Sequence, residues 1–299
     1  MARRRKGRDI SGWVVVDKPA GPSSNAVVGT VRRALDARKA GHAGTLDPEA
    51  TGLLAVALGE ATKTVPALMD APKSYRFAVR FGAATTTDDA EGEPVASSDT
   101  RPDDAAIEAA LPALTGEVMQ VPPAFSAVKV AGRRAYAVAR AGGEVALAAR
   151  PLTVHALRLA DRPDADTAIL EMTCGKGGYV RAVARDLGAR LGCHGHALWL
   201  RRTATGPWTE ADATPLGAVS EAALRPLEEA LGHLRRVDVD AGGAGRLRHG
   251  IALECEAPDG PCWASQGGTA VALAEVASGR LRPTRVIAPR GPLDPPPIA

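Results

Sequence analysis

A run rich in turn-forming residues, residues 41–52, constrains this chain of 299 residues more than any other segment. Its three glycines permit backbone angles that other residues avoid, and Pro48 biases Asp47 away from helical angles. A lone Asp-Pro pair more often forms an Asx-type turn, but here the apolar stretch at 53–58 follows, with the length of a buried strand. The pattern therefore predicts a rigid loop at a sheet end, with the Asp47 carboxylate facing a cleft.

The periodicity of apolar residues predicts the elements around this loop. Ser23, Ser24 and Asn25 are N-cap candidates for a helix, because the valines that follow them recur at helical spacing. Residues 75–81 alternate with period two, which indicates a strand with one apolar face. The other predicted elements are strands at 13–16, 152–159 and 167–174, a short helix after Asp103, a helix from Arg181, and a linking helix at 212–236.

Charge is distributed unevenly along the chain. The formal net charge of +3 is too small by itself to indicate a nucleic-acid binder. Basic residues nevertheless cluster close to the loop, at 32–33 and 38–39, and again near Arg181 and at 201–202. Residues 121–145 mix prolines, aromatics such as Tyr136 and bases such as Arg140 without a period. This segment suits either an exposed surface excursion or contact with RNA phosphates and bases.

The signals for targeting and for metal binding are weak. The basic first six residues are not followed by an apolar signal-peptide core, and no stretch approaches the roughly 18 apolar residues of a membrane span, so a cytoplasmic protein is expected. The four cysteines fall at scattered spacings. His194 and His196 lack neighbours that would complete a ligand set beyond Cys193, so no metal is expected.

Four segments, in order along the chain, match the motifs of one enzyme family. The stretch at 41–63 closely resembles the catalytic motif of the bacterial tRNA pseudouridine-55 synthases, the TruB family, and reads GHAGTLDPEATGLLAVALGEATK. Residues 13–19 resemble the opening strand of the family, residues 73–92 its second motif, and residues 178–181 with 200–203 its third. The chain departs from the family at Ala43, where Thr is frequent, and at Glu49, where an apolar residue is common.

The resemblance implies an α/β (α+β) fold and a division into parts. A mixed, mainly antiparallel central sheet would be flanked by helices in a catalytic domain at residues 10–235, with an RNA-contacting insertion at about 121–145. A basic arm at residues 1–9 would precede it. A small PUA-like β domain at 236–299 would follow, and a monomer is expected.

The same resemblance implies the reaction. The family isomerises uridine to pseudouridine at position 55 in the T loop of tRNA, by flipping the base and using an Asp, here Asp47, as the nucleophile. Arg181 would pair with the Asp47 carboxylate, and Tyr75 would stack on the base and take part in proton transfer. Attack at ribose C1′ and attack at uracil C6 both stay open. The reaction needs no redox step, so no cofactor is expected.

Further residues would contact the substrate. His42 would occupy the space that the flipped nucleotide leaves, and the acceptor stem of tRNA would reach the C-terminal domain. The other residues that the resemblance assigns to binding RNA or uracil are Lys18, Lys63, Tyr179, Leu200, Arg201 and Arg202. Plain alternatives are a surface charge for each of the two lysines and core packing for Tyr75 and Leu200.

Two other functions stay open on sequence grounds. The first is a tRNA-folding chaperone that acts by binding alone and does not need Asp47 for chemistry. The second is an Asp-dependent nucleoside hydrolase, which would release free uracil and would not require a stem-loop.

Overall fold

The computed structural model describes residues 7–126, 128–130, 133–135, 143, 146–289 and 291–296. The chain divides into two compact units: the first is Met1–Ala71 with Ala204–Ala299, and the second is Pro72–Thr203. Each unit has a hydrophobic core of its own. No helix in the described part of the chain is long and apolar enough to cross a membrane.

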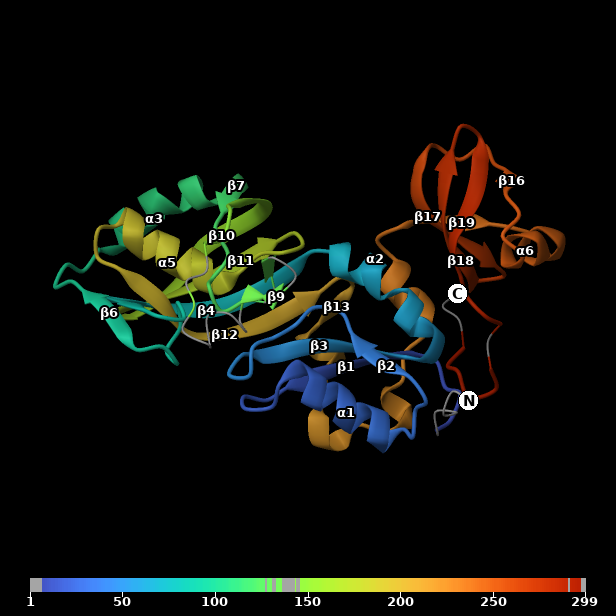
Figure 1. Cartoon of the computed structure of the whole chain (residues 1–299), viewed down its shortest axis with the longest axis horizontal. Coiled ribbons are helices and arrows are strands. Elements are labelled where there is room, and N and C mark those ends of the chain that lie inside the picture. The colour runs from blue at the N-terminus through green and yellow to red at the C-terminus, as the bar shows by residue number, and fades with distance from the viewer. Residues whose placement is uncertain are drawn as a thin grey trace. The chain divides into compact units, whose positions relative to one another are not determined.

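Two buried strands, with two short strands and a helix beside them, form the core of the first unit's catalytic-motif region. β1 (Gly12–Lys18) pairs antiparallel with β3 (Thr51–Leu58) along its whole length and parallel with β14 (Thr214–Pro215). β2 (Ala40–His42) pairs antiparallel with β3. Helix α1 (Ser24–Ala34) lies beside these strands in Figure 1, with Val27 and Val31 buried. The predicted helix and both predicted strands are confirmed.

The first turn of α1 shows why this segment is helical. The side chain of Ser23 accepts a hydrogen bond from the backbone N–H of Ala26 at 3.2 Å, which satisfies one of the free donors at the helix start. The valines then face the sheet, and Arg32 and Arg33 stay exposed in the last turn. Two shorter helical segments follow β3, η1 (Gly59–Lys63) and α2 (Val65–Asp70).

The prediction of a linking helix at residues 212–236 is wrong. This stretch forms short 3-10 helices, η3 (Glu210–Asp212), η4 (Leu216–Ala218), η5 (Glu221–Ala223) and η6 (Leu227–Leu231). Pro215 and Pro226 lie directly before η4 and η6, and a proline ring prevents an α-helix from continuing through it. The apolar residues of η6 are nevertheless buried, in the core that also holds Trp13 and Trp208.

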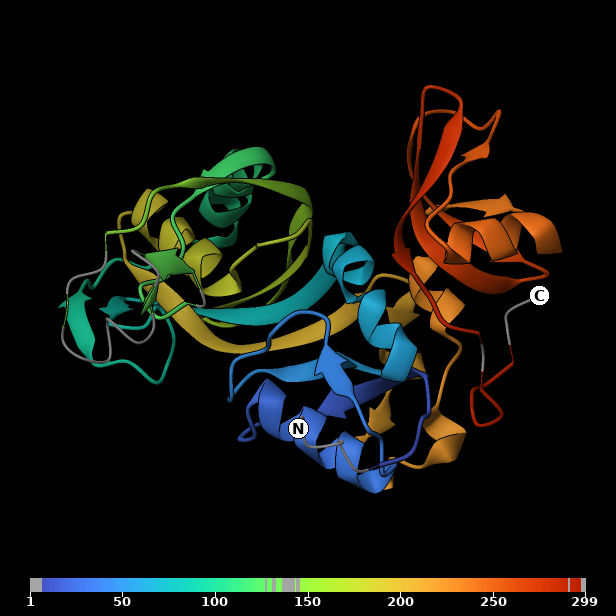
Figure 2. The same cartoon turned by 45° about the vertical axis from the view of Figure 1, so that its right-hand side comes forward.

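A small β domain ends the first unit, as predicted. Its sheet has the order β15 (Arg235–Asp238), β17 (Gly260–Gln266), β18 (Thr269–Ala277), β19 (Arg280–Val286) and β16 (Leu253–Glu254). Figure 2 shows the strands curling around α6 (Ala241–Arg248). Ala244 and Leu247 of α6 pack into the core of this domain.

The second unit is a sheet with two helices on one face. Its strands follow the order β12 (Gly195–Thr205), β4 (Lys73–Phe81), β11 (Thr167–Cys174), β10 (Arg150–Asp164) and β7 (Gly116–Gln120). Helices α3 (Asp104–Ala110) and α5 (Val180–Arg190) cover the same face in Figure 1. Phe77 and Val79 of β4 are fully buried, whereas Arg76 is exposed, which confirms the predicted alternation. The predicted fold class, with its mixed and mainly antiparallel sheet pairing, is confirmed.

Shorter elements connect these strands. They are β5 (Ala83–Thr85), β6 (Pro94–Ser97), η2 (Leu111–Leu114), β8 (Lys129–Val130), β9 (Arg133–Arg134) and, in the first unit, β13 (Trp208–Thr209). Tyr136 and Arg140 of the predicted insertion lie outside the described residues, as do the first six residues of the predicted arm.

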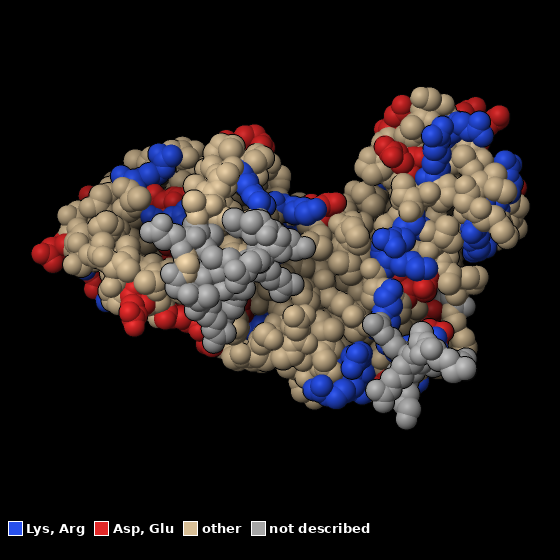
Figure 3. Space-filling view, in the orientation of Figure 1, with Lys and Arg blue, Asp and Glu red and all other residues tan. Residues whose placement is uncertain are grey.

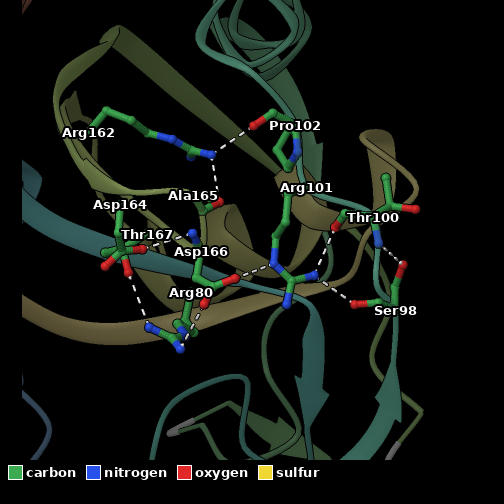
Figure 4. A network of polar contacts seen from close by, with 10 residues as sticks. All are labelled: Arg80, Ser98, Thr100, Arg101, Pro102, Arg162, Asp164, Ala165, Asp166 and Thr167. Atoms are coloured by element: carbon green, nitrogen blue, oxygen red, sulfur yellow. Dashed lines mark hydrogen bonds and ion pairs between the residues drawn. The ribbon is translucent and has the colours of Figure 1, made fainter.

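An ion network joins β4, the turn between β10 and β11, and the segment before α3 (Figure 4). Asp166 accepts bonds from Arg80 Nη2 at 3.1 Å and from Arg101 Nε. Arg162 donates to the carbonyls of Pro102 and Ala165, each at 2.7 Å. The hydrogen bond from Arg101 is the largest cause that lowers the pKa of Asp166. The network therefore ties the turn between β10 and β11 to β4 and to the segment before α3.

Candidate active site

The Asp47 loop, residues 43–50, connects β2 to β3 in the first unit. Gly44 at its start has a φ of 93°, and Gly52 just beyond its end has a φ of 94°, in the region that favours glycine. The backbone carbonyl of Asp47 accepts a bond from the N–H of Ala50 at 3.2 Å, so the chain turns directly after the carboxylate. Asp47 itself is half-buried. The predicted position of the loop at the end of a sheet strand is confirmed.

Lys18 fixes the backbone on the C-terminal side of this loop. Its side chain is fully buried, and its ammonium group donates to the carbonyls of Pro19 at 2.9 Å, Pro48 at 2.6 Å and Ala50 at 2.6 Å. The carbonyl of Pro48 also accepts a bond from the N–H of Gly21 at 2.9 Å. The surface-charge alternative for Lys18 is wrong, because the side chain has no exposed surface. Lys18 positions the loop through its backbone.

Ser24 holds the N-terminal side of the loop. Its buried hydroxyl donates to the carbonyl of Leu46 at 2.8 Å and accepts from the N–H of Leu46 at 2.8 Å. Ser24 is also the first residue of α1, so the start of the helix is tied to the residue before Asp47. The backbone on both sides of the carboxylate is thus fixed by buried side chains, which limits the directions in which the carboxylate can point.

His42 and Lys63 lie at different places along the same strands. His42 ends β2, faces Val56 in the register of β3, and is half-buried directly before the loop. Lys63 lies in η1, beyond the other end of β3, and its ammonium contacts Glu60 Oε2 at 2.6 Å and the carbonyl of Val286 at 2.9 Å. The eight residues of β3 span roughly 25 Å, so the structure does not bring Lys63 to the loop.

Arg181 is held firmly at the start of α5 in the second unit. Its side chain is buried, with only 7% of its surface exposed. The guanidinium donates to the carbonyls of Thr87 at 2.8 Å and Phe125 at 2.9 Å, and it lies 3.4 Å from Asp89 Oδ2. Because the guanidinium is planar, these contacts fix its orientation as well as its position.

A second arginine, one turn along α5, binds the same two segments. Arg185 Nη1 lies 2.9 Å from Asp88 Oδ2, and Nη2 donates to the carbonyl of Val121 at 2.8 Å. Asp88 has a φ of 60°, and burial raises the pKa of its carboxyl while Arg185 partly offsets that effect. Sequence reasoning missed this pairing. Two features of the sequence could have indicated it: Arg181 and Arg185 are four residues apart and so share one face of the helix, and Asp88 and Asp89 offer two consecutive acids as partners.

The turn that α5 holds is tight. Thr87 Oγ1 donates to Asp89 Oδ1 at 2.5 Å, and the N–H of Glu91 donates to the same oxygen at 3.0 Å. A Cβ at Gly92 would lie 2.5 Å from Thr87 Oγ1 and 2.7 Å from the backbone nitrogen of Thr87. A side chain at this position would clash with the turn, so only glycine fits there.

The predicted aromatic and apolar site residues also belong to the second unit. Tyr75 is half-buried on β4, opposite Met172 of β11, and packs against the core. Leu200 of β12 packs partly buried against that core too. The backbone N–H and C=O of Tyr179 both bond to the side chain of Gln120, at 3.0 and 3.1 Å. These two hydrogen bonds to Gln120 fix the backbone of Tyr179, the residue that precedes α5.

The remaining predicted residues are Arg201 and Arg202, which follow Leu200 on β12. Arg201 is half-buried, whereas only 1% of the surface of Arg202 is exposed. Burial raises the pKa of the Cys174 thiol to about 11, so this cysteine is not a thiolate at neutral pH. Among the described residues, no group of three or more His, Cys, Asp or Glu is arranged to hold a metal ion.

Comparison with known proteins points to one family. The model described as "TruB family pseudouridylate synthase (N terminal domain)" matches residues 32–180, and "tRNA pseudouridylate synthase B C-terminal domain" matches residues 181–237. The tRNA pseudouridine synthase B of Dinoroseobacter shibae is 57% identical over 96% of this chain and 98% of its own length. That of Caulobacter vibrioides is 49% identical over 96% and 99%.

Solved structures share the fold. The crystal structure of a Cbf5-Nop10-Gar1 complex contains a chain with a TM-score of 0.73 and 25% identity, covering 93% of this chain and 85% of that one. The structure of an H/ACA RNP bound to a substrate RNA containing 2'-deoxyuridine gives a TM-score of 0.71 at 23% identity, with 93% and 86% covered.

Proposed function

The chain belongs to the TruB family of pseudouridylate synthases, and from this membership we propose that it isomerises uridine to pseudouridine at position 55 in the T loop of tRNA. The observation that carries the proposal is the Asp47 loop. Ser24 and Lys18 fix its backbone on both sides of one half-buried carboxylate. A carboxylate held in this way is suited to attack a bound nucleoside.

The reaction conserves every atom of the uracil ring except one exchangeable hydrogen. The bond between N1 and C1′ breaks, the base rotates, and a bond between C5 and C1′ forms. The proton on C5 leaves to solvent, and N1 gains a proton. Because substrate and product are isomers, the reaction consumes no redox equivalent, and the proposal includes no cofactor. Asp47 forms the covalent intermediate, at C1′ of the ribose or at C6 of the uracil, and this choice stays open.

Two residues assist Asp47 in this proposal. Arg181 is its counterion, keeps the carboxylate ionised and directs it, which suits a guanidinium that the second unit already holds in one orientation. Tyr75 stacks against the uracil ring and takes part in moving the proton from C5. The half-buried place of Tyr75 on β4, with its ring at the edge of the core, supports the stacking role.

The substrate must be turned out of the folded RNA before Asp47 can reach it. His42, directly before the loop, is proposed to occupy the space that the flipped nucleotide leaves. Tyr179, Leu200, Arg201 and Lys63 are assigned to contacts with uracil or with RNA. Lys18 and Arg202 complete the residues assigned to RNA; both are buried, and Lys18 also positions the backbone of the Asp47 loop.

A modification map of unmodified tRNA transcript tests the proposal. The transcript is incubated with the wild type and with Asp47→Ala, treated with a carbodiimide that marks pseudouridine, and read by primer extension. We expect one stop in the T loop with the wild type and none with the variant. Equal stops from both proteins would remove Asp47 from the mechanism. Refolded but unmarked tRNA would favour the chaperone, and free uracil released without a stem-loop would favour the hydrolase.

A further inference from the structure

A basic hollow lies at the C-terminal end of α1, in the first unit. Its volume is about 540 Å³, and its wall is formed by residues 32–33 and 36–40. Four cations line it, Arg32, Arg33, Arg38 and Lys39, against a single acid, Asp36. All five residues are exposed. Figure 3 shows Lys and Arg side chains gathered over α1, low in the view.

The backbone beneath the hollow is fixed. Asp36 adopts a left-handed φ of 45°, and its N–H bonds to the carbonyl of Arg33 at 3.1 Å. Arg8 then pairs with the turn from both sides, since its N–H donates to the carbonyl of Asp36 at 2.6 Å and its carbonyl accepts from the N–H of Arg38 at 3.0 Å. The cations therefore extend from a rigid turn, which reduces the entropy lost when they bind a ligand.

Little of this positive charge is neutralised within the described residues. Arg38 Nη1 lies 3.3 Å from Asp9 Oδ2, but 47% and 76% of these side chains are exposed, so the pair is weak. Arg33 donates to the hydroxyl of Thr30 at 3.2 Å, which leaves its charge unchanged. No ion pair of Arg32 or Lys39 is found in the described part of the chain. A surface of this kind attracts a polyanion.

Stabilisation of the helix end accounts for only two of the four cations in the hollow. Arg32 and Arg33 lie in the last turn of α1, where cations stabilise the helix dipole by about 0.3–1 kcal/mol each. Arg38 and Lys39 come after the helix, on the chain that leads into β2, and the dipole does not require them. Substitutions of Arg38 and Lys39 therefore test a binding role of the cluster without removing the cations that stabilise the helix.

The hollow lies at a defined distance from the Asp47 loop. Ser24, at the start of α1, bonds the loop, whereas the hollow is at the other end of this helix of 11 residues. A helix of that length spans roughly 16 Å. Strand β2 makes the same connection, because Lys39 precedes it and the loop follows it. Successive phosphates of one strand are several ångströms apart, so this distance equals a few nucleotides.

We propose that the basic hollow binds the phosphates of the RNA stem a few nucleotides from the target uridine. The inference rests on the proposed function, because it takes the ligand to be the substrate RNA. The hollow supplies affinity and orientation at a distance from the reacting atoms. Arg38 and Lys39 each neutralise one phosphate, and Arg32 and Arg33 extend the contact along the same strand.

The test measures binding and not turnover. Proteins carry Asp47→Asn so that no reaction occurs, and the dissociation constant for a T-arm hairpin is measured from 50 to 300 mM salt. The double variant Arg38→Gln with Lys39→Gln should bind about tenfold more weakly at 100 mM salt, and its log–log salt slope should fall by about two. The matched control neutralises two exposed arginines of the second unit, Arg158→Gln with Arg190→Gln, and should change neither quantity by more than about twofold.

An unchanged dissociation constant and an unchanged salt slope in the double variant would overturn the inference. Arg38→Lys, which keeps the charge, should bind as the parent does; a loss as large as that of Arg38→Gln would also count against it. If the double variant unfolds at a lower temperature than the parent, Lys39→Gln alone decides the matter, with an expected loss of about threefold. Wild-type protein that binds the hairpin through the hollow yet leaves no pseudouridine would overturn the proposed function and not this inference.

Discussion

Replacing Lys18 by methionine tests whether a buried ammonium holds the Asp47 loop. Methionine keeps most of the volume of the side chain but removes all three bonds to the carbonyls of Pro19, Pro48 and Ala50. Hydrogen bonds from a charged donor contribute about 1.5–3 kcal/mol each, whereas burial of the ammonium costs several kcal/mol. The difference leaves an expected loss of about 2–4 kcal/mol in the free energy of unfolding.

Urea unfolding followed by tryptophan fluorescence measures this loss. Trp13, Trp208 and Trp263 are buried in the first unit, whereas Trp199 of the second unit is exposed, so the change in emission on unfolding comes mainly from the unit that contains Lys18. Lys39→Met, at an exposed lysine of the same unit, is the matched control and should leave the free energy of unfolding within about 0.5 kcal/mol. If Lys18→Met proves as stable as this control, the ammonium does not hold the loop and the reasoning fails. The rate constant kcat should also fall, by roughly 100-fold, because the carboxylate loses its fixed direction.

Three further changes follow from the buried and paired groups. Asp166→Asn should lower the Tm at pH 7, because Arg101 lowers the pKa of Asp166 in the folded state; calorimetry should show that the difference shrinks as the pH falls below the ordinary carboxyl value of about 3.9, and a difference that persists in acid would refute the assignment. Asp88→Asn should not lower the Tm at pH 7, since burial raises the pKa of Asp88 despite Arg185; the contribution of Asp88 to the stability of the wild type is therefore largest when its carboxyl is protonated and is lost as the pH rises through the folded-state pKa, so a melting curve in which the variant is clearly less stable at pH 7 would contradict this sign. Ser24→Ala should cost about 1–3 kcal/mol in urea unfolding because it leaves a buried N–H and C=O of the loop unpaired, and an unchanged midpoint would show that the loop does not depend on this hydroxyl.

The sequence predicts those parts of the fold that local pattern controls. The apolar run of β3, the alternation of β4 and the spacing of the valines in α1 each identify an element, because burial on one face imposes the period. Ser23 marks the start of α1 for the same local reason. The glycines at 44 and 52 and the proline at 48 identify the loop through backbone angles alone.

Other features depend on contacts between residues far apart in the chain. Nothing local distinguishes Lys18 from a surface lysine, since its acceptors at Pro48 and Ala50 lie about thirty residues away. The pairing of Arg185 with Asp88 bridges 97 residues and becomes visible only when α5 packs on β4. At residues 212–236 the apolar stripe of η6 resembles one face of a helix, but the prolines before it and the packing of Leu227 and Leu231 into the core produce short 3-10 turns.

The central claim is that Asp47 attacks the target uridine, and release of the C5 hydrogen measures this most directly. A T-arm hairpin labelled with tritium at C5 of its uridine is mixed with excess enzyme, and tritium in water is followed over one turnover. The wild type and Glu49→Gln, which neutralises an exposed acid of the same loop, should each release one tritium per hairpin, whereas Asp47→Asn should bind the hairpin and release none. Release by Asp47→Asn at a rate within tenfold of the wild type would contradict the account.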